Sequence, residues 1–170
     1  MINVALFLTY DEYMTENKIK DICPSAVLEI KCSIKGWRLM FRRFYNEAAV
    51  TLEKGNEDDV VPVVVWDIDI DDLEVMEAVY PEEIYVKKYF NLASGNLTFS
   101  AFTYVMVETP IVMPEEDYLD SIMEAYCEHN FDLTCVENAL DFAADYSRKG
   151  RNENGSLHEG TDRESQQHKP

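Results

Sequence analysis

The sequence predicts an α+β domain in which helices surround a mixed, barrel-like β-sheet. The chain has 170 residues, of which 46% are hydrophobic, so it is long enough for one domain with a sizeable core. Short apolar runs of the kind that form strands outnumber the helical patterns. The run at residues 60–68 is apolar almost throughout, which is typical of a central strand covered on both faces.

The first half of the chain is expected to contain five strands and one helix. Residues 2–9 are apolar and rich in branched side chains, which favours a buried strand. A polar turn at residues 10–14 leads to a short helix over residues 15–21, with Thr15 as a suitable cap and an end before Pro24. Further strands are predicted at residues 26–33, 36–44, 47–53 and 60–68, with a solvated loop at 54–59.

The second half of the chain is expected to contain three helices and a hairpin. A helix over residues 72–79 is capped by Asp71 or Asp72 and ends at Pro81. Ser94-Gly95-Asn96 is a turn sequence, so the flanking apolar runs predict a hairpin. The hairpin strands are predicted at residues 84–92 and 97–107, and the last two helices at residues 115–129 and 133–147.

The C-terminal segment differs in composition from the rest of the chain. From Ser147 onward it carries five basic and four acidic side chains and one aliphatic residue, Leu157. Such a segment buries too little apolar surface to offset its ordering entropy. We therefore predict a folded domain over residues 1–146, with a formal charge of −19, and a disordered polar tail over residues 147–170.

The charge balance restricts the classes of partner. Fifteen Lys and Arg residues stand against 33 Asp and Glu residues, which gives a formal charge of −18. Nucleic acids and anionic membranes require a basic face, so we expect neither as a direct partner. An acidic protein can instead imitate nucleic acid and occupy a basic protein such as a DNA-binding enzyme, so a basic protein partner stays open.

The cysteines and the N-terminus indicate a cytoplasmic protein with reduced thiols. The first ten residues lack the basic region of a signal peptide, and no apolar stretch approaches the roughly 20 residues of a membrane span. No pair of cysteines has CxxC spacing, and His129 is the only histidine before the tail, so we expect no metal site. The cysteines are Cys23, Cys32, Cys127 and Cys135.

Other local motifs give no specific chemistry. The acidic run at residues 67–72 lacks the Gly and the final Glu of a calcium loop, which favours a strand end and a helix cap. Cys127 and His129 are two positions apart on a predicted helix, so their side chains point away from each other. No Gly-rich phosphate loop or nucleophile motif is present, and we expect no cofactor.

A series of short runs carries a more specific signal. In order they read LTYDEYM (8–14), CPSA (23–26), GWRLMFR (36–42), AVTLE (49–53), VPVVVWDI (61–68), IYVKK (84–88) and YVM (104–106), followed by Pro114, Tyr118, Ile122 and Tyr126. This series, over about residues 3–140, resembles the gamma-glutamylcyclotransferase-like family, which includes plant avirulence-induced proteins and small bacterial members. The resemblance implies a mixed barrel with helices packed around it.

The resemblance also implies a reaction and its requirements. In the family, the free α-amine of a γ-glutamyl group attacks its own γ-amide carbonyl, and the products are 5-oxoproline and a free amine. Backbone N–H groups of a Tyr-Gly-Ser-Asn loop hold the substrate carboxylate. A glutamate in a later segment takes the amine proton and returns it to the leaving group.

This sequence departs from the family at both of these places. Tyr10 matches the motif tyrosine, but Asp11, Glu12 and Tyr13 replace Gly, Ser and Asn. In an alignment without gaps, Tyr80 occupies the position of the catalytic glutamate. If Tyr80-Pro81 instead matches the Tyr-Pro of the family segment, the Glu-Gly pair before it is deleted, and the base is absent from its place in either case. Such a loop should repel the carboxylate of a γ-glutamyl substrate, because like charges about 4 Å apart repel by roughly 4 kcal/mol near a protein surface.

Three functions follow from these observations. In the first, cyclotransfer is lost and the barrel pocket binds or sequesters a planar or cationic small molecule. In the second, the protein releases 5-oxoproline with a relocated carboxylate, Glu77, Glu82 or Glu83. In the third, the acidic surface is a decoy for a basic partner. The candidate ligand-binding residues are Tyr10, Asp11, Glu12, Tyr13, Thr51, Tyr80, Tyr104 and Tyr118.

Overall fold

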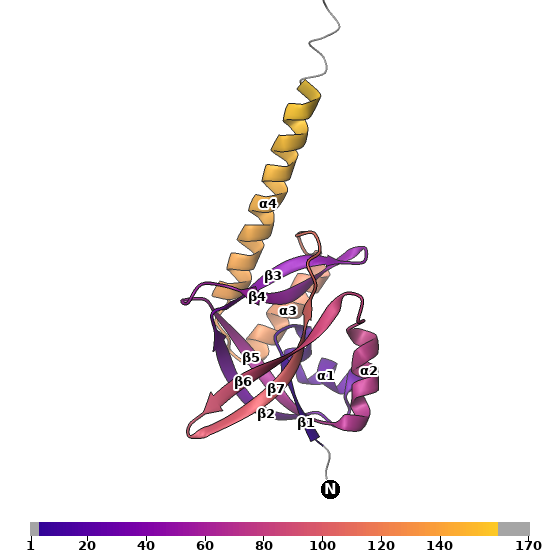
Figure 1. The fold of residues 1–170 in the computed structure, drawn as a ribbon, viewed down its shortest axis with the longest axis vertical. Helices are drawn as coiled ribbons and strands as arrows, with labels where there is room; N and C mark the ends of the chain where they lie inside the picture. Colours follow the sequence, from indigo (N-terminus) through magenta and orange to yellow (C-terminus); the bar gives the residue numbers. More distant parts are fainter. Residues whose placement is uncertain (1–3, 160–170) are drawn as a thin grey trace, which may run out of the picture.

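The computed structural model describes residues 4–159, and within this range strands form the body and helices lie around it (Figure 1). The strands are β1 (Val4–Thr9), β2 (Val27–Lys35), β3 (Trp37–Phe44), β4 (Glu47–Lys54), β5 (Val60–Asp69), β6 (Tyr85–Ser94) and β7 (Leu97–Met106). The α-helices are α1 (Glu16–Ile22), α2 (Leu73–Val79), α3 (Glu116–Glu128) and α4 (Thr134–Glu159), with 3₁₀ turns η1 (Glu12–Met14) and η2 (Ile70–Asp72). The predicted order of strands and helices is confirmed.

The main sheet is mixed and has β1 at its centre. Its strand order is β2-β5-β1-β7-β6, and β1 pairs antiparallel with β5 and parallel with β7. Strands β3 and β4 form a separate antiparallel pair beside this sheet. The predicted α+β class with a mixed, barrel-like sheet is confirmed, and the barrel takes the form of a curled half-barrel with two sheets.

Strand β5 supplies the centre of the core. Four of its valines are completely buried, and Ile68 is buried as well, as expected for a strand covered on both faces. Trp66, with 1% of its surface exposed, donates a hydrogen bond from Nε1 to Thr9 Oγ1 at 3.0 Å. Thr9 Oγ1 in turn donates to the Val64 carbonyl at 2.9 Å, so the one polar group of the indole is satisfied inside the core.

The C-terminal helix is longer than the sequence analysis predicts. The structure continues α4 to Glu159, so the helix predicted over residues 133–147 runs past the expected start of the tail. Val136, Ala139 and Ala143 are buried, and this first part of α4 packs on β3. Once these contacts have nucleated the helix, each added residue gains a hydrogen bond without needing a core contact, so the polar sequence continues it.

The projecting part of α4 extends well beyond the body of the domain (Figure 1). The remainder of the predicted tail, residues 160–170, lies outside the described residues. Within residues 4–159, no helix has the length and apolar character needed to cross a membrane.

We expect Thr9→Val to destabilise the fold by about 1–3 kcal/mol, because it removes the acceptor of the buried indole N–H of Trp66. Urea denaturation of both proteins measures the difference. The matched control is Thr98→Val, an exposed threonine on β7, which should change stability by less than about 0.5 kcal/mol. Equal stability of Thr9→Val and wild type would show that this hydrogen bond is not needed.

Candidate functional site

The predicted loop lies at the end of the central strand. β1 ends at Thr9, and the chain then turns through Tyr10 and Asp11 into η1 and α1. Asp11 caps the 3₁₀ turn, because its Oδ1 accepts a hydrogen bond from the Tyr13 N–H at 3.1 Å. Because β1 is the middle strand, this turn is buried, and only 6% of the Asp11 surface is exposed.

Tyr80 is the direct partner of the Asp11 carboxylate. It follows the last residue of α2 and donates from Oη to Asp11 Oδ2 at 2.7 Å. Its ring stacks on that of Tyr104, with centroids 4.8 Å apart and an interplanar angle of 10°, and meets the Tyr85 ring edge-on at 5.1 Å. Tyr80, also 6% exposed, therefore fills the centre of the site with its own ring.

The other predicted residues connect this centre to the surrounding elements. Tyr10 donates its hydroxyl proton to the Tyr104 carbonyl on β7. Thr51 on β4 accepts from the Met106 N–H at 2.8 Å, and the Tyr118 hydroxyl on α3 accepts from the Val50 N–H at 3.0 Å. The eight predicted ligand-binding residues thus surround one region, which we call the tyrosine-carboxylate cluster: Tyr10, Asp11, Glu12, Tyr13, Thr51, Tyr80, Tyr104 and Tyr118.

The two carboxylates of the cluster both hold protons more tightly than usual. Burial raises the pKa of Asp11 to about 6, although the hydrogen bonds from Tyr80 and from the backbone oppose the shift. Burial also raises the pKa of Glu12 to about 8, and the negative charge of Asp11 adds to this shift. Glu12 Oε2 is buried and has no hydrogen-bond partner among the described residues.

The tyrosines of the cluster remain protonated over the physiological range. Burial is the main cause that raises the pKa of Tyr80, Tyr104 and Tyr118, and the nearby carboxylates Asp11 and Glu12 raise that of Tyr80 and Tyr118 further. The cluster therefore offers neutral hydroxyl donors and two carboxylates that share one buried space.

The carboxylates that the sequence analysis offers as relocated bases lie elsewhere. Glu77, Glu82 and Glu83 are all exposed. Glu83 accepts a hydrogen bond from the Tyr45 hydroxyl at 2.6 Å, which lowers its pKa, and the charge of Glu77 contributes to the raised pKa of Tyr104. The structure does not bring Glu82 or Glu83 to the cluster, and Asp11 and Glu12 are the carboxylates inside it.

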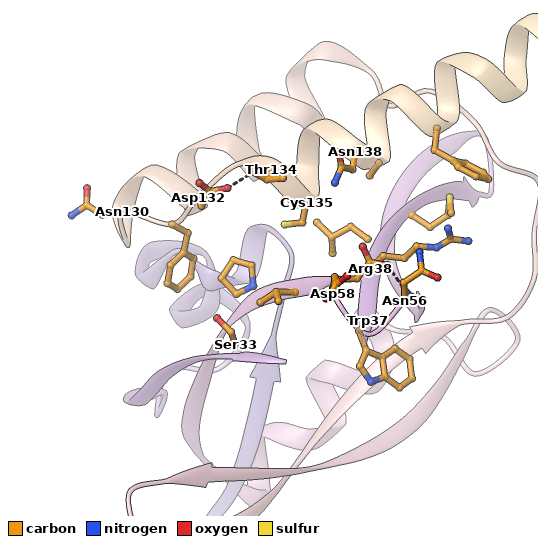
Figure 2. A pocket seen from close by; sticks show the side chains of 18 residues that line it. Ser33, Trp37, Arg38, Asn56, Asp58, Asn130, Asp132, Thr134, Cys135 and Asn138 are labelled. Carbon is orange, nitrogen blue, oxygen red and sulfur yellow. Dashed lines mark hydrogen bonds between the residues drawn. The ribbon is translucent and has the colours of Figure 1, made fainter. Parts of the chain in front are cut away.

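A second feature, which the sequence analysis misses, is a cavity of about 570 Å³ beneath α4 (Figure 2). Its lining comes from three separate stretches, within residues 33–40, 56–62 and 130–142, and it shares no residue with the tyrosine-carboxylate cluster. The sequence does not indicate a shared cavity for these stretches, because only the packing of α4 on β3 brings them together.

Comparison with known proteins identifies the fold. The sequence matches no family model and no curated protein. Among solved structures, a gamma-glutamyl cyclotransferase superposes with a TM-score of 0.70 at 16% identity, over 85% of this chain and 87% of that one. An uncharacterized human protein has a TM-score of 0.67 at 17% sequence identity, over 85% of this chain and 87% of that one. YkqA from Bacillus subtilis has a TM-score of 0.65 at 12% sequence identity, over 84% of this chain and 55% of YkqA.

The chain therefore has the gamma-glutamyl cyclotransferase fold, as the resemblance in sequence implies. At these identities the likeness concerns the fold alone. What the protein does has to be argued from its own residues.

Neutralising Glu12 should remove part of the pH dependence of stability. The folded protein keeps a proton on Glu12 up to about pH 8, whereas the unfolded chain releases it near the ordinary value of 4.5. The stability that this proton contributes is complete below about pH 4.5 and is lost as the pH rises through about 8. We expect Glu12→Gln to gain stability over wild type between pH 5 and pH 9, measured by urea denaturation at each pH.

Glu124→Gln is the matched control for this experiment. Glu124 is exposed on α3, so the free energy of unfolding of this variant should differ from that of wild type by the same amount at pH 5 and at pH 9. If the stability difference between Glu12→Gln and wild type is also independent of pH, Glu12 does not titrate as the buried geometry requires.

Proposed function

We propose that this protein uses the gamma-glutamyl cyclotransferase fold to bind a small molecule and has lost the cyclotransfer reaction. The observation that carries the proposal is the hydrogen bond from Tyr80 to Asp11. It joins the tyrosine that an alignment without gaps sets at the position of the catalytic glutamate to a carboxylate of the loop that, by the resemblance, would bind an anion.

The chemistry of cyclotransfer argues against activity at this arrangement. The reaction needs a base that takes a proton from the substrate amine. Tyr80 cannot do this at neutral pH, because burial raises its pKa and its hydroxyl proton is already donated to Asp11. The loop that would hold the substrate carboxylate carries Asp11 and Glu12, and an ionised carboxylate there repels an anion.

The same residues favour a small organic cation as the ligand. An ammonium group beside Glu12 would give Oε2 the donor that it lacks and would compensate the burial of a negative charge. Tyrosine rings close to a carboxylate also favour a cation, because their faces are negative. Glu12, Tyr13 and Tyr118 are only partly buried, so the ligand would bind against them, beside the stacked pair of Tyr80 and Tyr104.

The first test of the proposal is an assay for turnover. A panel of γ-glutamyl amines is incubated with the protein, and 5-oxoproline is quantified by liquid chromatography and mass spectrometry. We expect no release above the background without protein, because the loop carries carboxylates that repel the substrate carboxylate and Tyr80 does not accept the amine proton at neutral pH. Release in proportion to protein concentration would overturn the proposed loss of cyclotransfer.

The second test measures binding of primary amines, such as phenethylamine, by isothermal titration calorimetry. We expect Glu12→Gln to weaken binding at least tenfold, because the variant keeps the shape of the side chain but cannot ionise to pair with the ammonium group. Glu124→Gln should bind as wild type does. If the panel of amines shows no binding to the wild-type protein, the proposed ligand class is wrong.

One observation favours a second candidate, an active cyclotransferase with a relocated base. A carboxylate with a pKa of about 6, such as Asp11, is suited to proton transfer near neutral pH. In that case 5-oxoproline release would be lost in Asp11→Asn and kept in Glu77→Gln, Glu82→Gln and Glu83→Gln. Loss of activity in one of the three exposed variants would instead favour the base that the sequence analysis names.

A further inference from the structure

The cavity beneath α4 has the size and the composition of a ligand site of its own. Its volume of about 570 Å³ lies within the roughly 300–1,000 Å³ of small-molecule pockets. It is bounded by α4 and the segment before it on one side, and by β3 and the segment before β5 on the other (Figure 2). Because it shares no lining residue with the tyrosine-carboxylate cluster, what it binds does not depend on the function proposed for that cluster.

Aromatic rings lie near the two ends of the stretch 130–142 that lines the cavity. Phe131 precedes α4 and Phe142 lies within it. The ring of Trp37 points away from α4 (Figure 2), on the face of β3 opposite to Arg38, where it contacts Lys54, Lys88 and Phe90. The Phe142 ring is held by the guanidinium of Arg38, and an ordered wall costs little entropy when a flat ligand packs against it.

Arg38 brings an unsatisfied donor to this cavity. Its guanidinium lies over the Phe142 ring, with Cζ 5.2 Å from the centroid, and its Nε is buried without a hydrogen-bond partner among the described residues. Arg42 lies four residues further along β3, and its Nε does have a partner, because it donates to Glu53 Oε1 at 2.7 Å. The fold thus pairs Arg42 with a carboxylate, whereas Arg38 lines the cavity with its Nε unpaired among the described residues.

The acidic residues of the lining are not equally available. Asp132 accepts a hydrogen bond from the Thr134 N–H, and Asp59 accepts one from the Asn56 N–H. Asp58 is exposed and has no hydrogen bond or ion pair through its side chain among the described residues. Asn138 extends from α4 toward the strands and offers both a donor and an acceptor (Figure 2).

We propose that this cavity binds a small aromatic zwitterion of the amino-acid type. The ligand carboxylate would accept from Arg38 Nε, its ring would pack beside Phe142, and its ammonium group would face Asp58. A zwitterion fits better than a simple anion, because the whole chain is strongly acidic and Asp58 and Asp59 line the same cavity.

The test is calorimetric titration of the full chain with phenylalanine, tyrosine and tryptophan. We expect saturable binding that weakens at least tenfold in Arg38→Met, which removes the guanidinium, and in Asn138→Trp, which obstructs the cavity from an exposed helix position. Arg43→Met and Glu137→Trp are the matched controls, because both residues are exposed, lie on the same strand or helix as the altered residue and do not line the cavity. Both controls should bind as wild type does.

Titration with two fragments of the ligand, phenethylamine and phenylacetate, distinguishes binding in this cavity from binding at the cluster. Phenethylamine lacks the carboxylate, so it should bind here at least tenfold more weakly than phenylalanine, and any binding that depends on Glu12 belongs to the cluster. Phenylacetate lacks the ammonium group and should also bind more weakly. The proposal is overturned if none of the three amino acids binds, or if they bind equally to wild type, Arg38→Met and Asn138→Trp.

Discussion

The central position of β1 is the constraint on which the site depends. Because β1 is hydrogen-bonded to β5 on one side and β7 on the other, the turn that follows Thr9 starts inside the protein. Asp11 is therefore buried, and a buried carboxylate needs a donor. Tyr80 supplies it from the end of α2, and its ring then stacks on Tyr104 of β7, so one hydrogen bond ties the loop, a helix end and the sheet together.

The tyrosine-carboxylate cluster and the cavity beneath α4 differ in their charge balance. The tyrosine-carboxylate cluster contains two carboxylates and hydroxyl donors, so desolvation raises the pKa of both acids. The cavity beneath α4 contains a buried arginine nitrogen without a partner. The first arrangement is suited to a cation and the second to a ligand that carries an acceptor, which is why the two sites need separate experiments.

Much of the fold can be predicted from the sequence because its elements are locally consistent. The valines of β5, the turn at Gly95 and the acidic start of α3 each favour the structure that they adopt. The main difference between the predicted and the observed elements is the position at which α4 ends. Its composition lacks the apolar residues of a core, but a helix already nucleated by Val136 and Ala139 against β3 can continue through polar residues.

The sequence by itself determined the class of fold and the substitutions at its loops, because strand and helix patterns and short motifs are local. Only the tertiary structure decided which carboxylates are buried: Asp11 and Glu12 lie inside the cluster, while Glu82 and Glu83 are exposed, although all four are candidate site residues in the sequence. The cavity with Arg38 was likewise beyond prediction, since its walls lie up to about a hundred residues apart and meet only through the packing of α4 on β3.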